Sequence, residues 1–421
     1  MRSSYRRIGG FVRLVDERNR DLAITTLLGL TINKEFIPSV ANTIGSDMAN
    51  YKIIRKGQFA CSLMQVRRDK KIPVAMLKNI EEAIISQAYP VFEIIDPQEL
   101  LPEYLMMWMS RSEFDREACF YAIGGVRGSL EWDDFCNMKL PVPSIEKQRE
   151  IVKEFNTIVN RIKLNVQVNQ KLEETAQAIY KQWFVDFEFP ISKEYAAEIT
   201  KPELEGKSYK SSGGEMVYNE ELDQVIPKGW KCCQLLSMVN TQYGFTASAS
   251  FDEIGPKFLR ITDIAQEYIE WDSVPYCEIS DREIEKYTLH EGDVVVARTG
   301  ATVGYAKRIN KRHPNSIFAS YLVRITPKDK CYEYFVGLSI VSEYFKAFIQ
   351  NVAGGSGQPQ ASATLMSEYA IIVPRKEYLL IFNKLITPLF DHAENYQAEI
   401  STLIGFKTIL LSGLASKGVS R

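Results

Sequence analysis

An internal duplication constrains the fold of this chain more than any other feature of its sequence. Each half contains four short motifs in the same order, followed by a long helical pattern. The first set is Glu103-Tyr104-Leu105, Ser112-Glu113-Phe114, Gly124-Gly125 and Leu140-Pro141-Val142-Pro143. The second set is Glu333-Tyr334-Phe335, Ser342-Glu343-Tyr344, Gly354-Gly355 and Ile371-Ile372-Val373-Pro374. The offset stays at about 230 residues, whereas solenoid repeats have periods of about 20 to 50. We therefore expect two related modules.

Composition places the chain among ordinary globular proteins of more than one domain. It has 421 residues, of which 45% are hydrophobic and 25% are charged, and single cores usually stop growing well below that length. The N-terminal residues lack the apolar core of a signal peptide, and no apolar run reaches the roughly 20 residues of a spanning helix. We therefore expect a cytoplasmic protein without a membrane segment. The formal charge of −2 neither supports nor excludes a nucleic-acid partner.

Two long heptad patterns follow the proline motifs. Steps of four and three residues alternate through Ile151, Phe155, Ile158, Ile162, Asn165, Asn169, Leu172, Ala176, Ile179 and Trp183. The same alternation runs through Phe382, Ile386, Leu389, Ala393, Tyr396, Ile400, Leu403, Lys407, Leu410 and Leu414. Two matched apolar seams predict two helices that pair. The alternative is that each seam is the buried stripe of a separate surface helix. Asn165 and Asn169 either determine the register of the pair or turn to solvent.

The modules themselves are predicted to be mixed α/β globules with irregular sheets. Runs typical of strands occur at residues 83–86, 91–95, 257–262, 293–298 and 320–325. Residues 189–225 are rich in Gly, Ser, Lys and Pro, which is the composition of a flexible connector. We therefore predict an α+β chain with a first module at 1–144, a helix at 145–188, a linker at 189–225, a second module at 226–375 and a second helix at 376–421.

The sequence contains no convincing catalytic or metal site. A DNA methyltransferase needs a glycine-rich cofactor turn and an Asp/Asn-Pro-Pro-aromatic loop, and neither string occurs. Gly206-Lys207-Ser208 lacks the earlier glycine of a phosphate-binding loop, because position 201 is Lys. The seven cysteines form no Cys-x-x-Cys pair, and the three histidines are isolated. We expect no catalytic residue and no metal ligand in this chain.

Local clusters of basic residues are the first candidates for contact with DNA. In the first module they are Arg67, Arg68, Lys70 and Lys71, and in the second they are Lys307, Arg308, Lys311, Arg312 and His313. Such clusters neutralise phosphates and release counterions. The alternative for each is a solvated loop, although one cluster occurs in each module.

Three loops are candidates for reading bases. The strand at 293–297 leads into Arg298 and Thr299, and an arginine in that position reaches guanine O6 and N7 with two hydrogen bonds. A loop arginine held in a salt bridge is the alternative. The glycine-rich loop at 354–360 carries Gln358, which suits adenine, and its counterpart in the first module carries Arg127 and Ser129. The alternative for either loop is a plain connection.

The chain resembles the specificity subunits of type I restriction-modification systems over nearly its full length. Residues 140–151, LPVPSIEKQREI, resemble the junction between a recognition domain and the conserved helix of the family, and residues 177–187, QAIYKQWFVDF, resemble the end of that helix. Residues 292–300, GDVVVARTG, and the loop at 354–360 are similar to second recognition domains of the family. The second helix departs from the pattern, since Arg375-Lys376-Glu377-Tyr378 stands where the first has Glu146-Lys147-Gln148-Arg149.

This resemblance implies a non-catalytic subunit that reads a split duplex DNA target. The two recognition domains would each bind one half-site, and the helices would form an antiparallel coiled coil of roughly 50 Å from Ile151 to Trp183, at about 1.5 Å per residue. It implies two modification subunits and a motor-nuclease restriction subunit as partners, with S-adenosylmethionine, ATP and Mg on those partners and no cofactor here. The leading alternative is a coiled-coil scaffold that binds only proteins, and a third is a solitary methyltransferase or nuclease.

Overall fold

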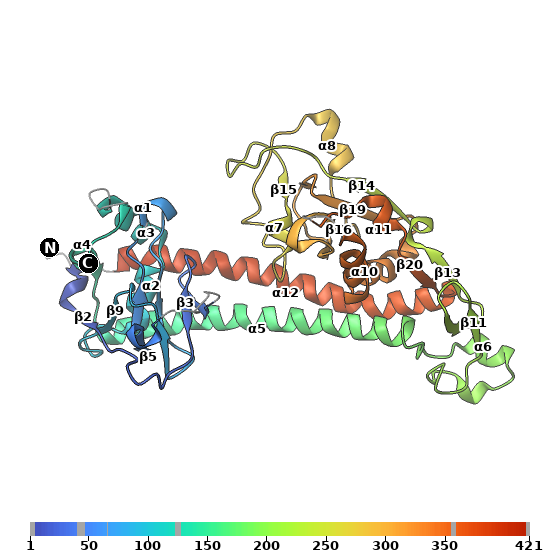
Figure 1. Ribbon diagram of the computed structural model, residues 1–421, viewed down its shortest axis with the longest axis horizontal. Coiled ribbons are helices and arrows are strands. Elements are labelled where there is room, and N and C mark those ends of the chain that lie inside the picture. The colour runs from blue at the N-terminus through green and yellow to red at the C-terminus, as the bar shows by residue number, and fades with distance from the viewer. Residues whose placement is uncertain (1–4, 40–46, 65, 123–127, 355–358, 418–421) are drawn as a thin grey trace. The chain divides into compact units, whose positions relative to one another are not determined.

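The structure is a computed structural model that describes residues 5–39, 47–64, 66–122, 128–354 and 359–417. The chain forms two compact units. Unit 1 comprises Met1–Leu164 with Ile400–Arg421, and unit 2 comprises Asn165–Glu399. The two long helices, α5 (Ile145–Phe184) and α12 (Lys376–Lys417), each contribute one part to each unit (Figure 1).

Each unit contains a four-stranded antiparallel sheet with the same strand order. In unit 1 the order is β2-β9-β6-β7, formed by Val12–Val15, Val91–Ile94, Phe59–Cys61 and Val74–Met76. In unit 2 it is β14-β19-β16-β17, formed by Val239–Tyr243, Leu322–Pro327, Val294–Ala297 and Ala306–Arg308. Corresponding strands therefore occupy corresponding places, which confirms the duplication.

Smaller strand pairs surround these sheets. The antiparallel pairs are β1 (Tyr5–Arg7) with β10 (Lys139–Pro141), β3 (Leu28–Leu30) with β4 (Phe36–Pro38), β5 (Lys52–Arg55) with β8 (Glu82–Ile85), β11 (Met216–Asn219) with β12 (Gln224–Pro227), and β13 (Lys231–Gln234) with β20 (Ala370–Val373). One pair is parallel, namely β15 (Lys257–Leu259) with β18 (Ser316–Phe318). The expected strand at 257–262 is shorter than predicted, because the Asp263 carboxylate accepts the Arg260 N–H and starts α7 (Ile261–Ile264).

The helices repeat with a constant offset. Unit 1 has α2 (Pro102–Met109), α3 (Ser112–Tyr121) and α4 (Trp132–Asn137), and unit 2 has α9 (Glu333–Val341), α10 (Glu343–Ala353) and α11 (Ala363–Ser367). Residue 102 begins α2 and residue 333 begins α9, 231 residues later; residue 145 begins α5 and residue 376 begins α12, again 231 later. The remaining α-helices described are α1 (Val66–Asp69), α6 (Lys193–Glu198) and α8 (Asp281–Tyr287).

β16 is buried on both faces of its sheet. Successive side chains of a strand point to opposite faces. Val294 and Val296 accordingly pack into the main core of unit 2, while Val295 and Ala297 pack into a second core on the other side. A run of four buried apolar residues thus forms a rigid strand, and the loop that begins at Arg298 starts from it.

Within each unit the two long helices run antiparallel to each other. In unit 1, Ile151 near the start of α5 and Leu414 near the end of α12 belong to one core. In unit 2, Trp183 near the end of α5 meets Phe382 near the start of α12, with ring centroids 5.5 Å apart. Every predicted seam residue of both helices is buried or half-buried. Asn165 is 1% exposed, so it lies in the seam rather than turning to solvent.

By length and composition, α12 has a stretch, Lys376–Ala415, that is apolar enough to cross a membrane. Its seam residues lie in the protein interior, because Phe382, Ile386, Ile400 and Leu414 are at most 1% exposed. That packing accounts for the apolar seam of this helix, while other apolar side chains of α12 are exposed.

The prediction of a flexible linker at 189–225 is wrong, because this segment is folded onto unit 2. Phe189 is fully buried, and its ring lies 4.5 Å from Tyr209, 4.7 Å from Trp230 and 4.4 Å from Tyr378. The segment also contains α6 and β11, and Ile191 N–H donates to the Lys207 carbonyl at 2.8 Å. A few aromatic residues anchor it although its overall composition is polar.

Candidate nucleic-acid interface

The candidate loops of the two units leave equivalent strands at the same point. In unit 1, Leu63 follows β6 and its carbonyl accepts the Leu130 N–H at 2.9 Å. In unit 2, Arg298 follows β16 and its carbonyl accepts the Ala361 N–H at 2.9 Å. Leu63 and Arg298 therefore occupy equivalent positions. We call this part of each unit the reading edge: residues 62–64, 66–71 and 128–130 in unit 1, and residues 298–305 and 359–361 with Tyr243 and Tyr321 in unit 2.

At their other ends, these strands begin with the same glycine turn. Gly57 and Gly292 have φ values of +86° and +88°, which a residue with a side chain rarely adopts. The next residue closes each turn with its side chain. Gln58 Oε1 accepts the Arg55 N–H at 2.8 Å, and Asp293 Oδ2 accepts the His290 N–H at 2.8 Å. Both strands therefore begin at the same kind of turn, in which a glycine with positive φ is followed by a polar residue whose side chain closes the turn.

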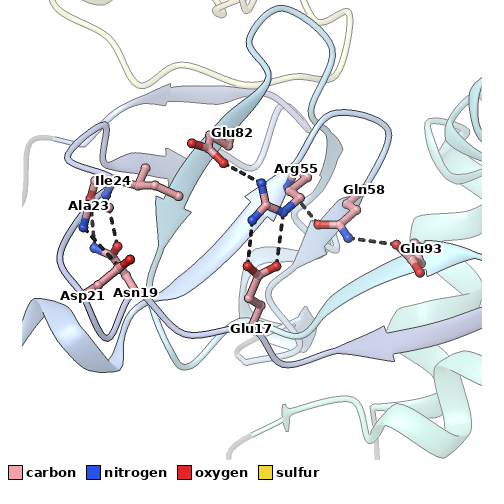
Figure 2. A network of polar contacts seen from close by, with 9 residues as sticks. All are labelled: Glu17, Asn19, Asp21, Ala23, Ile24, Arg55, Gln58, Glu82 and Glu93. Atoms are coloured by element: carbon pink, nitrogen blue, oxygen red, sulfur yellow. Dashed lines mark hydrogen bonds and ion pairs between the residues drawn. The ribbon is translucent and has the colours of Figure 1, made fainter.

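Charged groups around the start of β6 neutralise one another. Figure 2 shows that the Arg55 guanidinium is held by Glu17 and Glu82, while Gln58 Nε2 donates to Glu93 at 2.8 Å. The hydrogen bond from Arg55 lowers the pKa of the Glu17 carboxyl. This end of the strand therefore stabilises the sheet and offers little free positive charge to a phosphate.

The predicted basic cluster of unit 1 lies on its reading edge. Arg67, Arg68, Lys70 and Lys71 are all exposed, on α1 and the turn after it. Arg68 is paired with its neighbour Asp69, whose Oδ1 lies 2.7 Å from Nε.

The glycine loop of unit 1 reaches this cluster. A Cβ atom added to Gly128 would lie only 2.9 Å from Arg67 Cβ, so the loop lies directly against that arginine. Ser129 is half-buried beside it, and Arg127 lies outside the described residues.

Two exposed aromatic residues near this cluster were not among the predicted DNA contacts. Phe120 and Tyr121 end α3, are 69% and 38% exposed, and contact each other edge to face at 5.8 Å. The preceding residue, Cys119, donates its thiol to the Val66 carbonyl of α1 at 3.5 Å, which joins the two helices. The sequence feature that could have indicated these two residues is an aromatic pair directly before a glycine-rich loop.

In unit 2 the reading edge is built from paired backbone segments. Arg298 N–H donates to the Tyr321 carbonyl at 3.0 Å, and Gly300 N–H donates to the Pro359 carbonyl at 3.1 Å. Thr299 and Gln360 form an antiparallel bridge. Arg298 and Thr299 are thus held on a rigid edge, as half-buried residues. Gln358, the other predicted contact here, lies outside the described residues.

Two tyrosines complete this edge and were not predicted. The Arg298 guanidinium lies over the Tyr243 ring, with 4.7 Å from Cζ to the centroid. The Tyr243 hydroxyl accepts the Ala363 N–H at 2.9 Å. Tyr243 is 41% exposed and Tyr321 is 61% exposed. Nothing in the local pattern indicated them, because they come from two other strands or loops that the fold brings to Arg298.

Arg308, another predicted DNA contact, is paired and packed inside unit 2, which gives that prediction no support. Its side chain is 8% exposed, forms an ion pair with Glu333, and lies 4.9 Å from the ring centroids of both Tyr334 and Phe390. Since β17 pairs with β16 in antiparallel register, Arg308 lies beside Val294, at the opposite end of the strand from Arg298. This arginine stabilises the packing of β17 against α9 and α12.

The other basic residues of the second cluster also lie away from the reading edge. Lys311 N–H donates to the Glu394 carboxylate at 2.8 Å, and the Arg312 guanidinium donates to Asn395 Oδ1 at 2.7 Å. Both acceptors belong to α12. The fold therefore does not bring this cluster together with Arg298 and Thr299, although the side chains of Lys311 and Arg312 are exposed.

Burial holds several cysteine thiols in their protonated form. Burial raises the pKa of the Cys61 thiol and raises those of Cys232 and Cys277 to about 11, so these thiols stay protonated at neutral pH. Among the residues that the structure describes, no group of three or more His, Cys, Asp or Glu side chains is arranged to hold a metal ion.

α12 exposes several apolar side chains outside its seam, and α5 exposes Leu164. On α12 these are Leu380, Ile381, Leu385, Phe406 and Ile409, each at least 41% exposed, and on α5 Leu164 is 49% exposed. Exposed apolar residues that recur along one helix are typical of surfaces that bind another protein.

Comparison with known proteins agrees with this architecture. The family described as "Type I restriction modification DNA specificity domain" matches residues 65–174 and 241–401, one segment in each half of the chain. The HindI specificity subunit of Haemophilus influenzae is 24% identical over 86% of this chain and 86% of its own length. The MjaIX specificity subunit of Methanocaldococcus jannaschii is 22% identical over 76% of this chain and 70% of its own length.

A solved structure has the same fold. The S subunit of a type I restriction-modification system from M. genitalium superposes with a TM-score of 0.50 at 13% identity, covering 98% of this chain and 95% of that one. Because the family matches well over half of the sequence, in two segments that coincide with the duplicated halves, this chain belongs to the type I restriction-modification DNA specificity family.

Proposed function

We propose that this chain is the DNA-reading subunit of a type I restriction-modification complex. Each unit would read one half of a split duplex target through its reading edge, and partner subunits would carry out adenine methylation and restriction. The observation that carries this proposal is the equivalence of the two edges. They follow equivalent strands, and each presents exposed or half-buried basic and polar residues: Arg67, Arg68, Lys70 and Lys71 in one, Arg298 and Thr299 in the other.

The division of labour along the chain follows from the same proposal. Residues 1–144 and 226–375 are the two recognition domains, and the helices at 145–188 and 376–421 join them. The folded segment at 189–225 belongs with the second unit. Phosphate contacts to Lys311 and Arg312 remain part of the proposal, at a separate place from base reading.

The partners would bind the helices. Two modification subunits would cover the apolar side chains that α5 and α12 expose, and a restriction subunit would join for cleavage. S-adenosylmethionine, ATP and Mg would be bound by those partners, with none required here, and the complex would act in the cytoplasm. A protein scaffold without DNA readout is not favoured, because scaffolding gives no reason for two equivalent edges with basic residues.

Methylation mapping in cells tests this function. The chain is co-expressed with the modification subunit encoded beside it, and methylated adenines are mapped across the host genome by single-molecule sequencing, with and without this chain. We expect a split motif with a fixed spacer that is present only when this chain is expressed. An unchanged methylation pattern, together with a complex that assembles normally, would favour the scaffold.

A further inference from the structure

In the part of the chain that the structure describes, the charged residue Arg298 has no anionic partner. Within the described residues, its guanidinium contacts no carboxylate or carbonyl group, and its Nε atom is buried without a hydrogen-bond acceptor. A half-buried arginine normally has such partners, because taking a charge out of water is costly unless it is paired. Neighbouring arginines follow that rule: Arg308 pairs with Glu333 and Arg324 with Asp293. Arg298 is thus not the salt-bridged loop arginine of the alternative interpretation.

What holds this guanidinium in place is an aromatic ring. Tyr243 lies under it at 4.7 Å, a cation–π arrangement that orients the plane of the fork without consuming its donors. The ring is itself anchored at both ends. The Tyr243 backbone pairs with Val323 in the sheet, and the Tyr243 hydroxyl accepts the Ala363 N–H at the start of α11. The Tyr243 ring therefore holds the Arg298 side chain in place before any ligand arrives, which reduces the entropic cost of binding.

The backbone around Arg298 is also fixed. Hydrogen bonds on either side tie the residue to Tyr321 and to Ala361, and Tyr321 is largely exposed beside it. The result is a preformed fork of donors on a rigid edge, flanked by an exposed aromatic residue. Two parallel acceptors in one plane satisfy such a fork, and the O6 and N7 atoms of guanine in the major groove present that pattern.

We propose that Arg298 reads a guanine in the half-site bound by unit 2, with Tyr243 as the residue that positions it. This inference rests on the proposed function and adds the base and the residue pair. The equivalent position in unit 1 is Leu63, next to Met64, which is 50% exposed. An apolar residue there cannot donate to guanine, so the contact belongs to one half-site alone.

The test uses the chain in complex with its modification subunits, bound to duplexes that carry the methylation motif. Each guanine of both half-sites is replaced in turn by 7-deazaguanine, which keeps base pairing and O6 but lacks N7. We expect one guanine, in one half-site, whose replacement weakens binding by about tenfold or more, because a hydrogen bond to a charged donor is removed. Inosine at the same position, which retains O6 and N7, should bind nearly as well as guanine.

Variants connect that effect to Arg298. In Arg298→Ala, discrimination between guanine and other bases at this position should fall by about 5- to 150-fold, and the 7-deazaguanine effect should vanish. Arg298→Lys should keep only part of the effect, since an ammonium can donate to O6 and N7 but lacks the planar fork that stacks on Tyr243. Lys330→Ala removes an exposed cation elsewhere in unit 2 and should leave the effect intact. Tyr243→Phe retains the ring and should keep discrimination, whereas Tyr243→Leu should reduce it while the rest of the motif stays unchanged.

The outcomes separate this inference from the function on which it rests. Absence of any split motif with the wild-type chain overturns both. A split motif in which no guanine responds to 7-deazaguanine overturns the Arg298 contact alone, and this measurement needs no variant to fold. A response that persists in Arg298→Ala assigns the guanine to another residue and also overturns it.

Discussion

Gln148 shows how a single buried amide connects the start of α5 to the rest of unit 1 by hydrogen bonds. It is 0% exposed in the first turn of α5, where Oε1 accepts the Leu101 N–H at 2.9 Å. Its Nε2 donates to the carbonyls of Glu99 and Pro143 at 2.9 and 3.0 Å. The equivalent residue of α12, 231 positions later, is Leu379, which is 1% exposed. Hydrogen bonds of a buried amide therefore hold the start of α5, whereas a buried apolar side chain packs at the start of α12.

We expect Gln148→Ala to lower the free energy of unfolding by about 1–3 kcal/mol, because it removes three hydrogen bonds between a fully buried side chain and the backbone. Urea denaturation measures this. Gln170→Ala is the matched control: that glutamine is exposed on the same helix and bonds only to Glu174, so its loss should cost less than about 0.5 kcal/mol. Equal effects of the two variants would contradict the assigned role.

We expect His313 to make the stability of unit 2 depend on pH. Burial lowers its pKa below the ordinary value of 6.5, although its Nδ1 contacts the Pro314 carbonyl at 2.8 Å. Above pH 6.5 the imidazole is neutral in both folded and unfolded chains. Below it the unfolded chain takes up a proton first, so the stability that depends on neutral His313 is lost as the pH falls through that value.

His313→Gln should therefore flatten the pH dependence of unfolding between pH 7 and 5, when free energies of unfolding are measured at each pH. A wild-type and a variant curve with the same slope in that range would show that His313 does not carry the effect.

At the scale of elements, the segment at 189–225 behaves as part of the core of unit 2. Phe189, Tyr195 and Tyr209 are at most 7% exposed within it. Apart from the buried Ser192, its Gly, Ser and Lys residues are exposed or half-buried, and the aromatic residues between them supply enough buried area to order the chain. Removing one such ring leaves a cavity among Tyr209, Trp230 and Tyr378.

Phe189→Ala is thus expected to cost about 3–5 kcal/mol and to make residues 189–225 sensitive to limited proteolysis. Phe251→Ala makes the same chemical change at a side chain that is 79% exposed, and it should alter neither property. Rapid cleavage of the wild-type segment under native conditions would argue against its folded state.

At the scale of the whole molecule, the duplicated halves share a framework and differ at their edges. Unit 1 carries a cluster of exposed basic residues, whereas unit 2 carries one oriented arginine between two tyrosines. This difference predicts that the two edges contribute differently to affinity and to specificity, since phosphate contacts position a protein and base contacts specify the sequence.

Replacing Arg67, Lys70 and Lys71 together by alanine should weaken binding to all sequences alike. The slope of log affinity against log salt concentration should decrease by about 0.9 for each phosphate that the variant no longer neutralises. Binding isotherms of the complex at several salt concentrations measure it. Lys56→Ala, which removes a lysine paired with Glu81 in the same unit, should leave the slope unchanged. An altered methylation motif instead of a uniform weakening would mean that the cluster reads bases.

Features that depend on local order in the chain were predictable. Repeated motifs indicated the duplication. The seams indicated both helices, because the periodicity of apolar residues shows which face of a helix is buried, whatever that face packs against. The strand that leads into Arg298 belongs to the same class. These features depend on residues within a few positions of one another.

Only the tertiary structure decided which charges are available to a ligand. Arg298 and Arg308 are ten residues apart and both looked like DNA contacts. Glu333, from α9, and Phe390, from α12, bury one of them, whereas Tyr243, from β14, orients the other at the opposite end of the same hairpin. The aromatic anchors of residues 189–225 depend on Trp230 and Tyr378 in the same way. Pairing and burial are set by groups remote in sequence, so a local pattern cannot report them.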